Sequence, residues 1–243
     1  MPNKFYAPGE DRATRVRDLF ATVAPRYDLI NDLQSFGLHR WWKRKLIKRA
    51  APKKGEQVLD LCCGTGDVTF GLAARGVQAV GLDFSEAMLQ IARRRAEDQR
   101  RDLPPGARVD FVQGDAQSLP YSDDSFHIVT ISYGLRNLTD WRAGLVEMQR
   151  VAKPGGRLLV LDFGKPEMAW WRRIYFAYLR GIVPLFGKVF CGDSQTHSYI
   201  LESLVHYPGQ NGVAAAMQEI GCSGVSVCNF GGGIMSINYG CKK

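Results

Sequence analysis

The sequence has few of the residues that build metal centres. Its six cysteines are spread over 243 residues without a C-x-x-C pair, and only four histidines accompany them. This spacing gives no Cys/His cluster with zinc geometry, and it is typical of a protein from a reducing cytosol. We therefore expect a cytoplasmic protein without a metal centre.

Long uninterrupted apolar runs are also missing. The first residues contain no apolar segment of signal-peptide length, and the most apolar region, 174–190, is interrupted by Arg180, Pro184 and Lys188. That region is too short and too broken to span a bilayer. We expect no secretion signal and, at most, peripheral contact with a membrane.

Composition favours one domain. A hydrophobic content of 45% in 243 residues suffices for a single α/β domain, 1–243, and leaves no room for a second large one. The net charge of +8 comes largely from two basic stretches, 39–49 and 93–101. The second is typical of a solvated helix face. The first interleaves Trp41 and Trp42 with bases, which suits either nucleic acid or an anionic membrane surface.

The segment 60–67, DLCCGTGD, is the most informative part of the chain. It follows a buried-strand pattern at 57–59, and its glycines open onto a helix predicted over 68–73. A second apolar strand, 79–82, ends at Asp83, and Ser85 is a good N-cap for the next helix. Because an acid at this place can accept hydrogen bonds from ribose hydroxyls, Asp83 is predicted to bind a nucleoside.

The glycine pattern separates two classes of cofactor. A dinucleotide needs a third glycine where its pyrophosphate meets the helix, and here that position is Thr69. S-adenosylmethionine (AdoMet) has no phosphate and carries positive charge, which the acids Asp60 and Asp67 of the loop would favour. The sequence therefore predicts AdoMet, with NAD as the less favoured alternative.

Alternating strand and helix patterns predict an α/β fold with a mostly parallel sheet. After the two βα units, strands are expected at 109–113, 126–132 and 157–163, and helices at 12–24, 39–50, 140–151 and 213–220. The 126–132 strand is largely apolar, so we expect it to be central. Two last strands, 223–228 and 234–241, flank Gly231-Gly232-Gly233 as an antiparallel hairpin.

Candidate cofactor residues follow the carboxyl ends of the predicted strands, where ligands bind in such sheets. The Asp115 carboxylate could accept from an adenine amino group, and the Ala116 amide could donate to the ring. Each of these residues could instead serve only as a local turn or cap residue. The predicted set is Asp60, Gly64, Thr65, Gly66, Asp83, Asp115, Ala116 and Ser132.

Three further segments carry a family resemblance that runs nearly end to end. They are 27–31 (YDLIN) continuing through Ser35 to 39–42 (HRWW), 132–137 (SYGLRN), and 150–156 (RVAKPGG). With them the chain resembles the ubiquinone/menaquinone biosynthesis C-methyltransferases, a branch of the class I, Rossmann-like AdoMet-dependent methyltransferases. The resemblance implies a seven-stranded sheet, and AdoMet contacts from Thr65, Asp83, Asp115, Ala116 and Ser132.

The resemblance also implies methyl transfer to a ring carbon of a polyprenylated quinol. Cys62-Cys63 resembles the demethylmenaquinone branch. Two positions depart from the family pattern: Asn238 stands where histidine is frequent, and Gly164 where serine or asparagine is expected. Both departures concern the substrate end of the site.

Ring methylation needs a phenolate, because a phenol with a pKa of about 10 is mostly neutral at pH 7. Arg136, in the loop after the fourth strand, could stabilise that charge, and a nearby base or a water could take the proton. His39, Tyr27, Asp28 and Tyr133 are the other candidates, with His39 and Arg136 favoured. The plainer reading of His39 is a helix residue that packs on Trp42.

Two segments lie outside the cofactor fold. The helical extension 1–50 precedes the first strand, and the aromatic-rich segment 165–195 follows the fifth, where a substrate lid would lie. Residues 168–190 could line a channel for an isoprenoid tail, contact the inner face of the membrane, or simply belong to the core. Expected partners are the quinol substrate and an anionic membrane; nucleic acid is not expected, and a homodimer is left open.

Two other functions compete with quinol methylation. An AdoMet methyltransferase acting on another small molecule or on RNA would also explain the positive charge. A non-catalytic subunit of a quinone-synthesis complex would keep the fold and lose the activity. The intact loop residues Gly64, Thr65 and Gly66 argue against the second of these.

Overall fold

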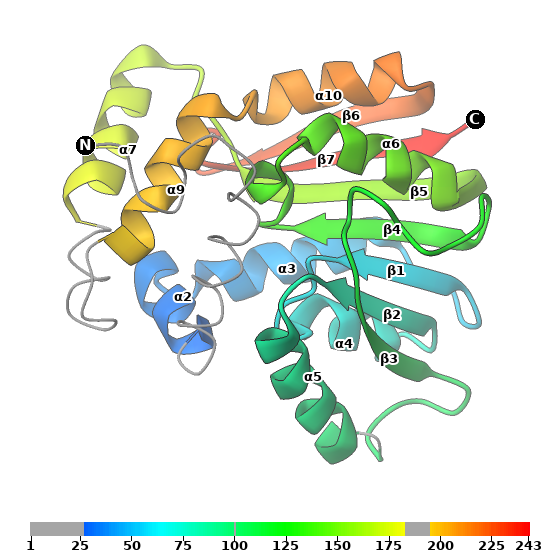
Figure 1. Ribbon diagram of the computed structural model, residues 1–243. Coiled ribbons are helices and arrows are strands. Elements are labelled where there is room, and N and C mark those ends of the chain that lie inside the picture. Colours follow the sequence, from blue (N-terminus) through cyan, green and yellow to red (C-terminus); the bar gives the residue numbers. More distant parts are fainter. Residues whose placement is uncertain (1–26, 100, 183–194) are drawn as a thin grey trace.

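The structure, a computed structural model, describes residues 27–99, 101–182 and 195–243 (Figure 1). The predicted helix 12–24 lies outside these residues. The elements in chain order are α2 (Tyr27–Ser35), α3 (Leu38–Ala50), β1 (Gln57–Leu61), α4 (Asp67–Ala73), β2 (Gln78–Asp83), α5 (Glu86–Gln99), β3 (Arg108–Gln113), β4 (Phe126–Ser132), the 3-10 turn η2 (Leu135–Asn137), α6 (Trp141–Val151), β5 (Ala152–Phe163), α7 (Ala169–Gly181), α9 (Gln195–His206), α10 (Gly209–Glu219), β6 (Cys222–Phe230) and β7 (Met235–Lys242).

The seven strands form one sheet in the order β3-β2-β1-β4-β5-β7-β6. Strands β1 to β5 are parallel, and β7 runs antiparallel between β5 and β6. The mostly parallel α/β sheet, the central position of β4 and the closing hairpin are thus confirmed. In Figure 1 the carboxyl ends of β1 and β4 point left, toward α2 and α9.

The period of two along the central strands divides the core between the two faces of the sheet. On β5, Leu158 and Val160 pack in the cluster that contains the α6 and α10 residues, whereas Leu159 and Leu161 pack in the cluster that contains those of α3 and α4. All four are buried. Both faces are therefore covered by helices, which leaves the ends of the strands for binding a ligand.

Helix α3 is held along the strands by contacts at its C-terminal end and at its middle. At its C-terminal end, Arg157 Nη1 donates to the carbonyls of Ala50 and Ala51 at 2.7 and 2.6 Å, near the amino end of the parallel part of β5. At its middle, Lys43 Nζ donates to Asp67 Oδ2 at 2.9 Å, just beyond the carboxyl end of β1. The N-terminal turn of α3 consequently projects past the carboxyl edge of the sheet.

Two boundaries differ from the predictions. Strand β5 begins at Ala152 rather than at 157, because Ala152 pairs with Phe126 before the register shifts and Gly155 turns at φ 73°. The predicted turn is thus a bulge inside the strand. Helix α9 was not predicted. Helix α5 begins after Ser85 as expected, but Ser85 Oγ has no hydrogen-bond partner among the described residues, so the hydroxyl does not cap it.

Candidate active site

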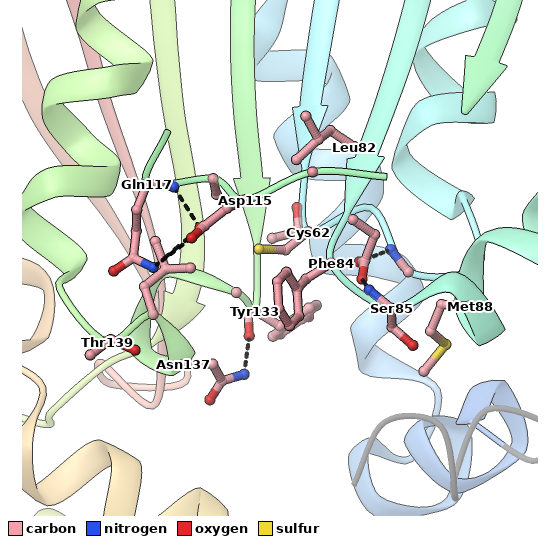
Figure 2. Close-up of a pocket in the computed structure, with 17 residues that line it drawn as sticks. Cys62, Leu82, Phe84, Ser85, Met88, Asp115, Gln117, Tyr133, Asn137 and Thr139 are labelled. Atoms are coloured by element: carbon pink, nitrogen blue, oxygen red, sulfur yellow. Dashed lines mark hydrogen bonds between the residues drawn. The ribbon is translucent and has the colours of Figure 1, made fainter. Parts of the chain in front are cut away.

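A pocket opens at the carboxyl ends of β1, β2, β3 and β4, where the sequence places the cofactor (Figure 2). Figure 2 shows Ser85 and Met88 on one side of it and Gln117 and Thr139 on the other. Its lining consists of Cys62, Gly64, Leu82, Asp83, Phe84, Ser85, Met88, Gly114, Asp115, Ala116, Gln117, Ser132, Tyr133, Gly134, Asn137, Leu138 and Thr139.

Asp83 fastens the glycine loop to the end of β2. Its Oδ2 accepts a hydrogen bond from the Gly64 amide at 2.8 Å, and its Oδ1 accepts from the Ser85 amide at 2.9 Å. Burial raises the pKa of Asp83 above its ordinary value, while these amides act in the opposite direction. Each carboxylate oxygen keeps a second lone pair, so ribose hydroxyls can still bind.

Asp115 occupies the opposite wall. Its Oδ1 accepts from the backbone amide and from Nε2 of Gln117, at 2.9 and 3.1 Å. Neither Asp83 nor Asp115 has an ion-pair partner within the part of the chain that the structure describes. Two acids without a cation favour a ligand that carries positive charge.

Several buried polar atoms around this pocket have no hydrogen-bond partner within the described part of the chain. Ser85 Oγ, Ser132 Oγ and Asn137 Oδ1 lack a hydrogen bond to any described residue, and all three residues line the pocket. Since buried polar groups in native proteins are almost always satisfied, a polar ligand is expected to supply these bonds. Hydroxyls, amines and a cationic centre on one molecule, as in AdoMet, match the acids and these atoms.

Two strained loops meet at the base of the pocket. Cys62 and Tyr133 are non-glycine residues with left-handed backbones, at φ 51° and 59°. A Cβ on Gly134 would lie 2.4 Å from Cys62 Cβ, so glycine is required for the two loops to touch. Such strain persists only where the surroundings enforce it, and it is frequent at functional sites.

The structure brings together five of the eight predicted cofactor residues: Gly64, Asp83, Asp115, Ala116 and Ser132 line the pocket. Asp60, Thr65 and Gly66 do not. Gly66, at φ 90°, is packed against Phe70 and Phe111, so it shapes the loop from behind. Thr65 is buried, and its carbonyl accepts from Arg95 at 2.9 Å.

Asp60, predicted to lie beside the cofactor, does not line the pocket. Its two oxygens accept from Thr69 Oγ1 and Thr130 Oγ1, both at 2.7 Å. Burial raises the pKa of Asp60 to about 6, against the effect of the two hydroxyls. Asp60 therefore ties β1 to α4 and β4 behind the glycine loop.

Arg136 does not line the pocket. It lies behind Tyr133, with Nη1 2.6 Å from Asp162 Oδ1 and 2.6 Å from the Tyr133 carbonyl oxygen. Its guanidinium also stacks over the Phe163 ring at 4.6 Å. Arg136 and Asp162 are both almost completely buried, so they form an internal ion pair that holds the strained Tyr133 turn.

His39 is buried in α3 with one ring nitrogen engaged. Ser35 Oγ donates to the Asn31 carbonyl at 2.6 Å, so it acts as acceptor for His39 Nδ1 at 3.0 Å. This makes Nδ1 the protonated nitrogen, and Nε2 then carries a lone pair with no partner among the described residues. Burial and the nearby Lys43 lower the pKa of His39 to about 4. Two of the three other catalytic candidates, Tyr27 and Asp28, begin α2, but their side chains lie outside the described residues.

The sequence reasoning missed part of the lining. The apolar wall of Leu82, Phe84 and Met88 has no motif of its own, although its position next to Asp83 was a usable signal. Asn137 and Gly134 lie within the 132–137 segment quoted for the resemblance. Among the described residues no cluster of metal ligands occurs, and no helix is long and apolar enough to cross a membrane. The described cysteines are free thiols.

Comparison with known proteins agrees with this site. The model of the ubiE/COQ5 methyltransferase family matches residues 9–242. The chain is 39% identical to the ubiquinone/menaquinone biosynthesis C-methyltransferase UbiE of Pseudoalteromonas translucida, and 38% identical to the demethylmenaquinone methyltransferase of Desulfitobacterium hafniense. Both matches cover 96% of this chain and 92% of the relative.

Solved structures share the fold at low identity. A SAM-dependent methyltransferase from Thermotoga maritima superposes with a TM-score of 0.65 at 18% identity, over 93% of this chain and 99% of its own. One from Aquifex aeolicus gives 0.62 at 18% identity, over 89% and 98%. The sheet order, the pocket at its carboxyl edge and the full-length match together show that the chain belongs to the ubiE/COQ5 methyltransferase family.

Proposed function

We propose that this protein transfers the methyl group of AdoMet to a ring carbon of a polyprenylated quinol, converting demethylmenaquinol to menaquinol, with the benzoquinol of ubiquinone synthesis as a second acceptor. The acidic pocket with its unpartnered Ser85, Ser132 and Asn137 atoms is the observation that supports AdoMet. Family membership supports the quinol, because the relatives named above are quinone-biosynthesis methyltransferases.

The residues present fit AdoMet part by part. Asp83 would bind the ribose hydroxyls, and Asp115 with the Ala116 amide would bind the adenine. Leu82 and Met88 would pack on the apolar faces of the nucleoside. When bound, AdoMet supplies a methyl group on a sulfonium leaving group.

The protein's share of the chemistry is to position the acceptor ring and to remove its hydroxyl proton. Once the ring carbon has gained the methyl group, that carbon must lose its own proton to a base or water, which makes the ring aromatic again, and the ring oxygen regains a proton. In-line alignment of ring carbon, methyl and sulfur accounts for most of the acceleration, because the leaving group is already good. His39 is the candidate base: it is neutral at pH 7, and Nε2 has a free lone pair among the described residues. Tyr133 lines the pocket, and Tyr27 and Asp28 remain candidates beside it.

We assign Arg136 the stabilisation of the phenolate, exerted from behind the Tyr133 turn. Burial raises the pKa of Tyr175 on α7, the Arg136 charge acts in the opposite direction, and Asp162 adds to the rise, so Tyr175 lies within reach of both charges of the pair. Because Asp162 faces the same guanidinium, a single substitution would leave a buried unpaired charge and destabilise the fold.

The acceptor is tested directly. Purified protein with methyl-labelled AdoMet is offered demethylmenaquinol, its benzoquinol counterpart, or total RNA, and labelled products are separated. We expect label in the naphthoquinol product, with less in the benzoquinol. Label in RNA and in neither quinol would contradict the proposal, and no label in any acceptor would favour the non-catalytic alternative.

Arg136 is tested by removing both charges of the pair. The double variant Arg136→Met/Asp162→Asn leaves no uncompensated charge, so it should fold and bind AdoMet in calorimetry. Loss of one oriented charge from a transition state costs about 10²–10³ in kcat. Turnover within threefold of the wild type would remove Arg136 from the mechanism.

We further propose that the protein docks on an anionic membrane through a docking face made of Phe36, Leu38 and Trp41 at the α2–α3 corner and Trp170 and Ile174 on α7. All five are exposed, Phe36 by 79%, and Tyr178 of α7 donates to the Gln34 carbonyl at 2.9 Å, which joins the two parts. Apart from Leu38 and Trp41, every exposed residue of α3 is a cation. RNA would need the charge but not the apolar corner, whereas an anionic bilayer uses both.

We also propose segment 165–195 as a cover for the substrate, and the support comes from its described part, 165–182. On α7, Tyr175 and Leu179 are buried in the core, whereas Trp170, Ile174 and Ile182 are exposed, so the aromatic stripe divides between core and surface. Phe186, which the sequence would place in the same stripe, lies outside the described residues. The N-terminal end of α3 projects from the edge of the sheet that holds the pocket, so a docked protein would face the bilayer with its active site.

Vesicle flotation tests the docking face. The protein should float with vesicles containing phosphatidylglycerol and less with pure phosphatidylcholine, and Phe36→Ser/Ile174→Ser should reduce the floated fraction severalfold. Val146→Ser is the control, because Val146 on α6 is about as exposed as Ile174 and lies outside the docking face. Equal flotation of both variants, or a wild type that stays in solution at low salt, would exclude this face.

A further inference from the structure

Asp67, directly after the glycine loop, joins three segments of the fold. Its Oδ2 accepts from Lys43 Nζ of α3 at 2.9 Å, and its Oδ1 accepts from Arg95 Nη2 of α5 at 2.8 Å. The second terminal nitrogen of Arg95 donates to the Thr65 carbonyl at 2.9 Å. None of these side chains lines the pocket, so their effect on a bound cofactor passes through the loop.

The loop needs such support because its backbone is strained. Cys62, Gly64 and Gly66 all have positive φ, at 51°, 56° and 90°. Asp83 holds the Gly64 amide, and Arg95 holds the next residue's carbonyl, that of Thr65. Asp83 ends β2, and Arg95 belongs to the helix that follows. These two contacts therefore fix the position of the glycine loop relative to the Asp83 carboxylate, the proposed ribose ligand.

The negative charge of Asp67 is taken up by its ion pairs with Lys43 and Arg95. Burial alone would raise the pKa of Asp67, but Lys43 and Arg95 outweigh burial and hold the pKa at about 2. The carboxylate therefore stays ionised at any working pH, and two cations neutralise it. Unlike Asp83 and Asp115, it does not serve to attract a cationic ligand.

The contact between Lys43 and Asp67 also orients helix α3. Lys43 lies one helical turn after His39 on α3, so the contact between Lys43 and Asp67 sets where the candidate base lies relative to the cofactor loop. A misplacement of about 1 Å in a reacting geometry can cost 100-fold in rate. The contact therefore holds α3, a helix that precedes the cofactor-binding fold in the chain, against the residue that follows the cofactor loop.

We propose that Lys43 and Arg95 are positioning residues of the active site: Arg95 shapes the AdoMet loop through Thr65 and Asp67, and Lys43 aligns α3 with that loop through Asp67. This inference rests on the proposed methyl donor. It assigns separate functions within the basic stretch 93–95: Arg93 pairs with Glu86 at the surface, whereas Arg95 holds the loop.

Calorimetry of AdoMet binding and steady-state kinetics test the proposal on the full chain. Arg95→Gln should weaken AdoMet binding about tenfold, the loss expected for a hydrogen bond to a charged group. Lys43→Gln should change the AdoMet dissociation constant less than threefold and lower kcat about tenfold, because it shifts the alignment of α3 and leaves the loop in place. Arg93→Gln, on the same helix, should match the wild type in both.

Arg95→Lys provides the rescue. The ammonium keeps a charge beside Asp67 but cannot also hold the Thr65 carbonyl, so its affinity should fall between those of Arg95→Gln and the wild type. It also serves as the comparison if melting curves show that Arg95→Gln does not fold. The proposal is overturned if the folded Arg95 variants bind AdoMet as tightly as the wild type, if Arg93→Gln weakens binding equally, or if Lys43→Gln leaves kcat unchanged. A wild type that binds no AdoMet would instead overturn the proposed function itself.

Discussion

Asp60 and Asp67 lie on either side of the glycine loop and have opposite surroundings. Around Asp60 burial dominates and raises the pKa to about 6, whereas around Asp67 two cations dominate and hold the pKa at about 2. Lowering the pH through 4 to 2 removes stability that Asp67 contributes, and raising it from about 4 to 6 removes stability at Asp60. Neither acid faces the pocket.

His39 gives a pH prediction at the same scale. Its pKa is about 4 in the folded protein and near 6.5 when unfolded, so the unfolded chain takes up the proton first as the pH falls. Stability should therefore be complete above pH 6.5 and fall by on the order of 3 kcal/mol down to pH 4. Urea unfolding of the wild type and His39→Gln at several pH values measures this, and an unchanged difference between the two across that range would contradict it.

The two departures from the family pattern meet at one residue. Gln210 is buried and clamps the Lys165 backbone: its Oε1 accepts from the Lys165 amide at 2.8 Å, and its Nε2 donates to the carbonyl at 3.0 Å. Asn238 Nδ2 donates to the Gln210 carbonyl at 2.8 Å. A Cβ on Gly164 would lie 2.4 Å from the Gly233 carbonyl oxygen and 2.9 Å from Gln210 Oε1.

Restoring the family's serine at this place should therefore harm this protein. Gly164→Ser should lower the free energy of unfolding by about 1–3 kcal/mol, the cost of overpacking. Gly181→Ser is the control, because a Cβ there meets nothing within 4 Å. Denaturant titration measures both, and equal midpoints would show that the junction yields to the new side chain.

At the scale of elements, helix ends are set by local chemistry. The predicted start of α6 at Asp140 is confirmed, since its Oδ1 accepts from the amides of Arg142 and Ala143 at 2.9 and 3.1 Å. Helix α3 has no side-chain cap at Gly37, and tertiary bonds from Arg157 and to Asp67 fix it instead. A sequence pattern reveals the first kind of end more readily than the second.

Asp140→Ala tests the local end. Loss of this cap should lower stability by about 1 kcal/mol without changing AdoMet affinity, because the residue lies outside the pocket. Asp140→Ser should recover most of the loss, since serine caps as well. A variant with unchanged stability would mean that tertiary packing alone holds the first turn of α6.

At the scale of the whole molecule, the strand order gathers the pocket. Strands β2, β1 and β4 are neighbours although β4 lies far along the chain, so Asp83, Gly64 and Ser132 meet at one edge. A ligand that bridges these strand ends binds only the folded state. Its binding energy therefore adds to global stability.

AdoMet should accordingly raise the melting temperature. At a concentration 100 times its dissociation constant it adds about 2.7 kcal/mol, which is about 5–10 °C for a chain of this size. Asp83→Asn should lose most of this shift, whereas Asp110→Asn, an exposed acid on β3, should keep it. Thermal scans with and without ligand decide, and an equal shift in both variants would remove Asp83 from the site.

The sequence by itself determined the order of the strands and of most helices, the glycine loop and the places of Asp83, Asp115 and Ser132. These depend on short-range patterns: period-two burial, a turn that needs glycine, and the rule that ligands meet the carboxyl ends of parallel strands. It also carried the family resemblance, because the segments 27–42 and 132–137 are contiguous.

Only the tertiary structure decided which charges face the pocket. Asp60 bonds Thr69 and Thr130, Arg136 pairs with Asp162, and Asp67 is shared by Lys43 and Arg95. The partners in these contacts lie between 9 and 70 residues apart along the chain. A charged side chain looks the same in sequence whether it meets a ligand or a counterion, and only the folded chain brings the counterion to it.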